Sequence, residues 1–193
     1  YPDGRQETTD YSYPAEGGQK SVTRDGQGNE IGGSVDLPDG SGSYWRLWSD
    51  GTKFESIRNT DYKTTQEKFT FTDGSQEITD YSYPAEGGEK SVTHDGQGNV
   101  TGESTTLPDG SNSNWGLDPD GTKIENFLDA DGRNIQRKFT YPDGRQSITD
   151  YSYPAEGGRK SVTRDAQGNV IAESVRLPDR SGSEWLFWPD CTK

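Results

Sequence analysis

The chain has 193 residues, of which 25% are hydrophobic and 27% are charged, and its formal net charge is −13 at pH 7. Because this field repels phosphate groups, nucleic acid and anionic membranes are poor partners, and no apolar run reaches the ~18 residues that span a bilayer. Hydropathy alone borders on disorder, but aromatic residues reach 11% and fall at regular positions. A thin β structure fits this composition better than a thick core.

The sequence repeats with a period of 70 residues. The stretch Thr-Asp-Tyr-Ser-Tyr-Pro-Ala-Glu-Gly-Gly occupies residues 9–18, 79–88 and 149–158. Self-similarity at a fixed period is typical of repeat architectures. We therefore divide the chain into copy 1 (residues 1–70), copy 2 (residues 71–140) and a partial copy 3 (residues 141–193) of one continuous array. The chain opens in mid-repeat without methionine, so we expect it to be a piece of a longer protein.

Turn signals recur within each copy. In copy 2 they fall at residues 72–74, 84–88, 95–99, 108–110, 119–121 and 131–132, about one turn for every ~12 residues. Many contain Asp-Gly, in which glycine takes a positive φ at no steric cost. Proline and glycine recur too often for helices. The sequence therefore predicts an all-β fold: a tandem-repeat antiparallel β-hairpin meander of about sixteen strands, forming an elongated or coiled sheet with a thin aromatic core.

Apolar residues that return in every copy alternate with polar ones, which places them on one face of a strand. Comparison of the copies predicts a structural core of tyrosine and tryptophan: Tyr11, Tyr13, Trp45, Tyr81, Tyr83, Trp115, Tyr151, Tyr153 and Trp185. Val22, Leu37 and their equivalents complete this buried face, which is one side chain wide. Stacking of such units leaves no single centre around which to build an enzyme pocket.

A second tryptophan marks the candidate ligand-binding residues Trp48, Trp188 and Asp118. Trp48 and Trp188 each follow a core tryptophan by three residues, so the two side chains face opposite sides of the strand. Asp118 stands at the same position in copy 2, and because a buried unpaired aspartate is costly, this position is predicted to be exposed. An exposed tryptophan beside acidic residues can stack on a sugar ring. The alternative is that it covers hydrophobic sheet against a neighbouring segment.

The sequence gives no support for a catalytic site. Acidic turn residues recur as Glu16, Glu86 and Glu156, but an array of exposed turns provides no cleft of the kind a glycosidase needs. His94 is the only histidine and matches arginine in the other copies, so we interpret it as a surface substitution. Cys191 replaces a turn glycine and cannot form an internal disulfide. We interpret it as drift or an artefact, with an intermolecular tether or a functional thiol as the alternative.

Calcium is the one ion that the composition favours. The loops are rich in aspartate, asparagine and glycine, and calcium takes several oxygen ligands. Residues 129–134, Asp-Ala-Asp-Gly-Arg-Asn, begin like an EF-hand loop but then depart from it. We therefore expect no cofactor and no metal site, with calcium as the alternative.

Residues 141–170 resemble tandem YD repeats of the Rhs type. In that family a Tyr-Asp pair is followed by two residues and then Gly-Arg or Gly-Asn. Residues 165–169, Asp-Ala-Gln-Gly-Asn, and 129–133, Asp-Ala-Asp-Gly-Arg, fit its second half, with Arg164 and Leu128 where tyrosine would stand. The resemblance implies a secreted or surface bacterial polypeptide whose β-hairpins coil into a shell, often around a toxin. A competing resemblance is to MORN repeats, which also carry an aromatic residue before Asp-Gly, as in residues 141–144.

Two functional hypotheses follow. The first is a non-enzymatic structural segment, acting as scaffold, shell or stalk in a large secreted or cell-surface bacterial protein, whose partners are other segments of the same polypeptide. The second is a carbohydrate- or ligand-binding repeat module that uses Trp48 and Trp188 with nearby acidic residues, and whose partner is a carbohydrate or a cell-surface molecule. Both place the chain outside the cell. An enzyme fragment is a weaker third alternative, because no residues support it.

Overall fold

The computed structural model describes residues 6–186, and every regular element in that range is a β-strand. The strands are β1 (Glu7–Ser12), β2 (Gln19–Asp25), β3 (Glu30–Asp36), β4 (Gly42–Leu47), β5 (Lys53–Arg58), β6 (Thr64–Thr70), β7 (Gln76–Ser82), β8 (Glu89–Asp95), β9 (Val100–Thr106), β10 (Asn112–Leu117), β11 (Lys123–Leu128), β12 (Asn134–Thr140), β13 (Gln146–Ser152), β14 (Arg159–Asp165), β15 (Val170–Arg176) and β16 (Gly182–Leu186). Equivalent strands recur at the 70-residue period, as β1, β7 and β13 do.

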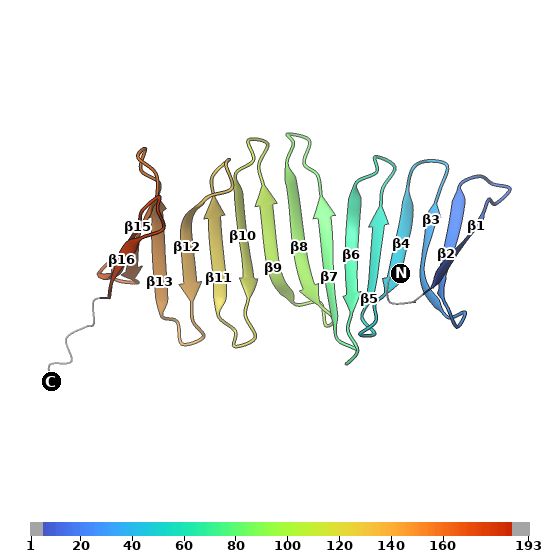
Figure 1. The fold of residues 1–193 in the computed structure, drawn as a ribbon, viewed down its shortest axis with the longest axis horizontal. Coiled ribbons are helices and arrows are strands. Elements are labelled where there is room, and N and C mark those ends of the chain that lie inside the picture. The colour runs from blue at the N-terminus through green and yellow to red at the C-terminus, as the bar shows by residue number, and fades with distance from the viewer. Residues whose placement is uncertain (1–5, 187–193) are drawn as a thin grey trace. The chain divides into compact units, whose positions relative to one another are not determined.

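The strands follow one another through a single sheet in chain order, from β1 to β16 (Figure 1). Neighbouring strands run antiparallel, as in the pairs β1–β2 and β15–β16, and the order does not close on itself. The predicted antiparallel meander is confirmed. By contact density the chain forms two compact units: unit 1 extends to Ser82 and includes Ser91–Thr101, and unit 2 comprises Tyr83–Lys90 and the chain from Gly102 onward.

Most hairpins close with a three-residue loop whose last residue is left-handed. In the loop between β3 and β4, the N–H of Gly40 donates to the carbonyl of Leu37 (3.1 Å), and the N–H of Leu37 donates to the carbonyl of Ser41 (2.9 Å). Gly40 has a φ of 89°, which L side chains rarely adopt. The carboxylate of Asp39 accepts the N–H and the hydroxyl of Ser41 at 2.9 and 2.6 Å. The recurrent Asp-Gly pairs thus fix the loop geometry.

The Gly-Gly pair at the end of each tyrosine-containing stretch has a steric cause. In copy 1, Gly17 and Gly18 have φ values of 93° and 84°. A Cβ atom on Gly18 would overlap the carbonyl oxygen of Asp36. Only glycine therefore allows the backbone at residue 18 to approach the backbone of Asp36 this closely.

The strand register defines two faces in each unit, because successive side chains point to opposite sides. The Trp45 face of unit 1 is defined by one cross-strand row: Val22, Gly33, Trp45, Glu55 and Lys68. The Tyr44 face is defined by the adjacent row: Ser21, Ser34, Tyr44, Ser56 and Glu67. In unit 2 the equivalent rows hold Trp115 and Asn114 and define the Trp115 face and the Asn114 face.

The predicted buried face does not form in the described part of the chain. No hydrophobic side chain there is buried, because the strands form one layer with no helix in the described range. Tyr11, Tyr13 and Trp185 are 61%, 74% and 52% exposed. The other members of the predicted core are half-buried: Trp45, Tyr81, Tyr83, Trp115, Tyr151 and Tyr153.

The repeated tyrosines and tryptophans also do not share a face. Tyr11 pairs with Ser21 and so belongs to the Tyr44 face, whereas Trp45 lies on the opposite one. A cation lies near the Trp45 ring, since the ammonium group of Lys53 is 5.6 Å from the ring centroid. A lysine so placed can lay its apolar stem along an aromatic ring while its charge stays in water.

Candidate functional site

Trp48 opens the turn between β4 and β5 and packs on the Tyr44 face of unit 1. Its N–H donates to the carbonyl of Thr52 at 2.8 Å, which closes the turn. The indole is nearly parallel to the Phe54 ring, with 6.4 Å between centroids, and lies 5.7 Å from the Phe69 ring. Trp48 remains 44% exposed. One part of the ring therefore packs on the sheet while another is open to solvent.

A concave region of about 760 Å³ opens beside Trp48, and we call it the Trp48 hollow. Arg46 lines it, and one of its guanidinium nitrogens lies 3.4 Å from a carboxylate oxygen of Glu7. Asp25, the last residue of β2, also lines it, and a hydrogen bond from the Asn29 side chain, with N–H groups of the following turn, lowers the pKa of Asp25. The Trp48 hollow therefore combines an aromatic ring with one cation and two carboxylates.

A second concave region of about 510 Å³ lies on the same face beside Tyr44, and we call it the Tyr44 hollow. Small residues make it concave. Ser56 sits between Tyr44 and Glu67 in one cross-strand row, and Gly42 has no side chain. A Cβ atom on Gly42 would lie 3.3 Å from the Arg58 Nε, so the glycine leaves room for the guanidinium.

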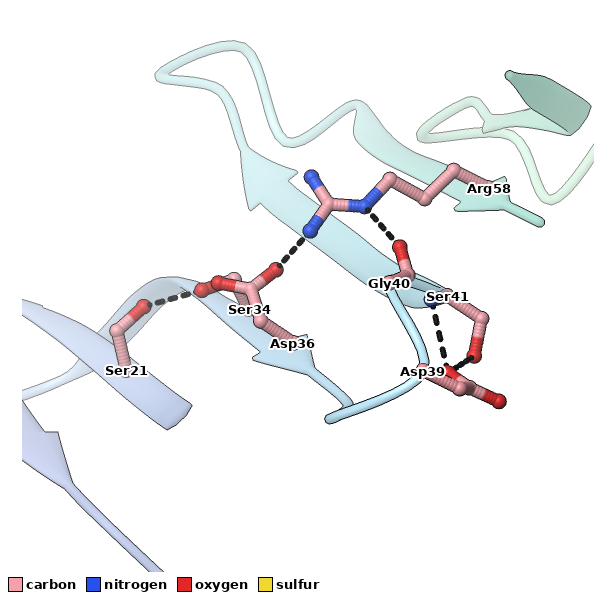
Figure 2. Close-up of polar contacts among 7 residues, drawn as sticks. All are labelled: Ser21, Ser34, Asp36, Asp39, Gly40, Ser41 and Arg58. Atoms are coloured by element: carbon pink, nitrogen blue, oxygen red, sulfur yellow. Dashed lines mark hydrogen bonds and ion pairs between the residues drawn. The ribbon is translucent and has the colours of Figure 1, made fainter. Parts of the chain in front are cut away.

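Arg58 lines the Tyr44 hollow and contacts three residues, of which Figure 2 shows Asp36 and Gly40. Its Nη2 donates to Asp36 Oδ1 on β3 at 2.7 Å, and its Nε donates to the carbonyl of Gly40 at 3.3 Å. Its guanidinium carbon lies 5.4 Å from the centroid of the Tyr62 ring. A side chain oriented in this way loses little further freedom when a ligand binds.

Tyr62 has a strained backbone, with a φ of 60°. The equivalent residue in copy 2 is Gly132, with a φ of 74°. A bulky residue in this region costs about 1–2 kcal/mol, and such strain gathers at functional sites. The ring is 70% exposed and lies against Gly40, where a Cβ atom would come within 3.0 Å of the Tyr62 Cζ. The strained turn therefore presents an aromatic ring beside Arg58.

Copy 2 replaces these residues with others. The substitutions at equivalent positions are Asn114 for Tyr44, Asp118 for Trp48, Ile124 for Phe54, Leu128 for Arg58 and Gly132 for Tyr62. The Asn114 face instead carries a directional series of hydrogen bonds: Arg137 to Asn126 (2.7 Å), Asn126 to Asn114 (3.0 Å) and Asn114 to Asn112 (2.7 Å). The aromatic surface beside the two hollows is therefore specific to copy 1 rather than to the repeat.

Only Trp48 of the predicted ligand-binding residues lines a described hollow. Asp118 begins the turn after β10, where its N–H donates to the carbonyl of Thr122 at 2.9 Å, and its side chain is exposed. It belongs to unit 2 and Trp48 to unit 1. Trp188 lies outside the described residues, as does Cys191.

Tyr44, Arg58 and Tyr62 were not predicted from the sequence, because the candidate positions were those at which an aromatic residue recurs in at least two copies. These three are peculiar to copy 1, as Asn114, Leu128 and Gly132 at the equivalent positions show. The available signal was a tyrosine at a turn position that elsewhere holds glycine.

His94 belongs to a cross-strand pair. Its Nδ1 lies 3.6 Å from the Asp80 carboxylate. The equivalent pairs in the other copies are full ion pairs: Arg24–Asp10 (2.7 Å) and Arg164–Asp150 (3.0 Å). His94 therefore occupies the position at which the other two copies have the arginine of a cross-strand ion pair on the sheet surface.

Acidic side chains are spread along the turns. Among residues 6–186, no three His, Cys, Asp or Glu side chains gather so as to hold a metal ion. In the loop that begins like an EF-hand, the Arg133 guanidinium binds the Asp129 carboxylate at 2.8 Å, and its hydrogen bond is the main cause of a lowered Asp129 pKa. That carboxylate is thus engaged within its own turn. The expectation of no metal site, with calcium as the alternative, stays a prediction.

No protein-family model and no curated protein matches this chain. Across residues 6–186, the structure has no helix with the length and apolar character needed to cross a bilayer. Function is therefore inferred from the geometry of the chain itself.

Proposed function

We propose that this chain is a non-enzymatic structural segment, a scaffold, shell or stalk, of a larger secreted or cell-surface bacterial protein. The observation that carries the proposal is the strand order, in which the strands pair with their neighbours in sequence and equivalent strands return every 70 residues. Each hairpin then adds a fixed increment of sheet without depending on a central core. Length and accessible surface are what a scaffold has to supply.

The turn carboxylates support a structural role. Hydrogen bonds from the hydroxyl and N–H of a serine two residues later lower the pKa of three equivalent turn residues: Asp39, Asp109 and Asp179. These groups stay ionised and form turns, so they are poor proton donors. The resemblance to YD repeats supports a surface or toxin-associated setting, with other segments of the same polypeptide as partners.

The test is removal of one whole period. Deleting residues 71–140 joins Thr70 to Tyr141, which reproduces the natural junction of Thr140 and Tyr141. The shortened chain should keep its far-ultraviolet circular dichroism per residue and unfold cooperatively. The matched control deletes residues 71–105, half a period, and should disrupt strand pairing. Equal loss of structure in both deletions would contradict a modular scaffold.

A second function, binding of a carbohydrate or another ligand, is favoured by the position of Trp48. Its 44% exposed ring borders a hollow that also contains Arg46 and Glu7. Apolar surface with a few oriented polar groups is the usual composition of a ligand site. Trp48→Ala should abolish ligand retention without changing the circular dichroism, whereas Trp45→Ala on the opposite face should retain the ligand. Equal loss in both variants would indicate a folding defect.

A further inference from the structure

We propose that the Tyr44 face of unit 1 binds a linear, uncharged oligosaccharide along an aromatic strip that joins the Tyr44 hollow to the Trp48 hollow. We define the aromatic strip as Tyr44, Phe54 and Trp48. The proposal rests on the second candidate function. It adds the ligand class, the Tyr44 hollow and the contribution of Arg58.

Phe54 makes the strip continuous. Its ring centroid lies 6.3 Å from that of Tyr44 and 6.4 Å from that of Trp48. Tyr44 and Phe54 line one hollow and Trp48 lines the other. Tyr44 and Trp48 are four positions apart, which corresponds to ~13 Å along an extended strand. A ligand that touches both ends must therefore be extended, and a single sugar ring does not reach.

Each end of the strip carries an oriented pair of opposite charges. At one end Arg58 is bonded to Asp36 at 2.7 Å, and at the other Arg46 lies 3.4 Å from Glu7. Each pair offers hydrogen-bond donors and acceptors but little net charge. A sugar ring has the complementary chemistry, since its C–H face packs on an aromatic ring while its hydroxyl groups both donate and accept. The rings and the charge pairs together therefore offer both kinds of contact that an oligosaccharide can make.

The net charge of the chain favours an uncharged ligand over an anionic polysaccharide or a second molecule of the same chain. The chain carries a net charge of −13, which repels an anionic polysaccharide. A second molecule of this chain brings the same negative charge to the interface. A neutral polyol does not experience this repulsion.

Copy 2 provides an internal comparison. It has asparagine, isoleucine and aspartate where the strip has Tyr44, Phe54 and Trp48. Leu128 takes the place of Arg58, so one of the charge pairs is missing as well. The proposal therefore assigns binding to unit 1 and none to the Asn114 face.

The test is calorimetric titration of the whole chain with defined oligosaccharides. The neutral probes are hexamers and dimers of glucose, xylose, mannose and N-acetylglucosamine, and the anionic probe is a galacturonic acid hexamer. At least one neutral hexamer should bind, at least tenfold more tightly than its dimer. Tyr44→Ala, Trp48→Ala and Arg58→Leu should each weaken binding about tenfold or more. Trp45→Ala on the opposite face and Asn114→Ala in copy 2 should leave it unchanged.

Each other outcome overturns a defined part of the proposal. If Trp48→Ala abolishes binding while Tyr44→Ala has no effect, or if dimer and hexamer bind equally, the strip is wrong and the Trp48 hollow acts alone. Binding of the galacturonic acid hexamer alone refutes an uncharged ligand. If no probe binds, the strip fails as an oligosaccharide site, and the carbohydrate form of the second function fails with it, whereas the scaffold is unaffected. Tyr44→Phe keeps the ring and should keep binding, which separates lost contact from misfolding.

Discussion

Gly33 lies directly opposite Trp45 across β3 and β4, and a Cβ atom on Gly33 would come within 2.8 Å of the indole nitrogen. In copy 2 the equivalent pair is Glu103 and Trp115, where the indole N–H donates to the carboxylate at 3.0 Å. The same tryptophan is therefore accommodated in two ways. In copy 1 the ring lies over a glycine, and in copy 2 its polar edge finds an acceptor.

Gly33→Ala should lower the free energy of unfolding by about 1 kcal/mol, because the new methyl group would come within 2.8 Å of both the Trp45 indole nitrogen and the backbone oxygen of Ser21. Alanine is itself the better strand residue, so the informative quantity is the difference between backgrounds. The loss in free energy of unfolding caused by Gly33→Ala should be smaller when the substitution is made in a Trp45→Ala chain. Urea denaturation of the four chains measures this coupling as a double-mutant cycle. Equal penalties in both backgrounds would show that the two residues do not interact.

The turn aspartates predict acid sensitivity. A hydrogen bond from the Ser75 hydroxyl, with one from its N–H, lowers the pKa of Asp73 below its ordinary value of 3.8. A carboxyl group whose pKa is lower in the folded state stabilises the fold above its unfolded pKa, and this stabilisation is lost as the pH falls through the folded pKa. The free energy of unfolding should therefore decrease below about pH 4.

Loss of negative charge in acid also relieves repulsion and acts in the opposite direction, so a matched variant is needed. Asp73→Asn keeps an acceptor in the turn but does not titrate. The stability advantage of the unmodified chain over this variant should shrink between about pH 5 and pH 2. A constant difference in urea midpoint would contradict the assigned role of Asp73.

His94→Arg should restore a full ion pair with Asp80 and raise the free energy of unfolding by about 0.5 kcal/mol at low salt. The gain is small because the two side chains are 27% and 51% exposed. It should vanish in ~1 M salt, and also in an Asp80→Asn background. The reverse change, Arg164→His, should destabilise copy 3 by a similar amount at neutral pH, because Arg164 pairs with Asp150 at 3.0 Å. A gain that persists in the Asp80→Asn chain would mean that the introduced guanidinium stabilises by another contact.

Within residues 6–186, two left-handed turn positions hold a residue other than glycine, and glycine should relieve the backbone strain at both. Arg180, with a φ of 70°, occupies such a position, and Arg180→Gly should raise the free energy of unfolding by about 1 kcal/mol. Tyr62→Gly should gain less, because it also removes the ring that lies 5.4 Å from the Arg58 guanidinium. Thermal unfolding compares the two.

Ligand binding gives the same pair of variants a second readout. Tyr62→Gly should weaken oligosaccharide binding, since Tyr62 helps to orient Arg58, whereas Arg180→Gly should not. If Tyr62→Gly stabilises as much as Arg180→Gly and binds normally, the Tyr62 ring has no role at the Tyr44 hollow.

The strand pattern was predictable because its causes are local. Glycine at a positive φ fixes each turn, as at Gly40 and its equivalents, and the spacing of turns sets strand length. In the turn after β2 and its equivalents, the one glycine position that changes between copies agrees with this explanation. Ala166 in copy 3 replaces Gly26 of copy 1, and Gly26 does not have a positive φ, so alanine fits there. The exposure of Trp48 was predictable from local spacing as well, since three residues along a strand reverse the side-chain direction.

Burial and the composition of the hollows were decided by tertiary structure. Sequence repetition suggested that Tyr11 and Trp45 share one buried face, but the register places them on opposite faces of a sheet with no buried hydrophobic side chain in the described range. Repetition reports which residues recur and does not report what packs against them. Tyr44, Arg58 and Tyr62 come together only through pairing of β3 to β6, so their proximity depends on cross-strand register. The local sequence therefore determines the repeat period and the turns, whereas contacts between strands determine which side chains share a face and line a hollow.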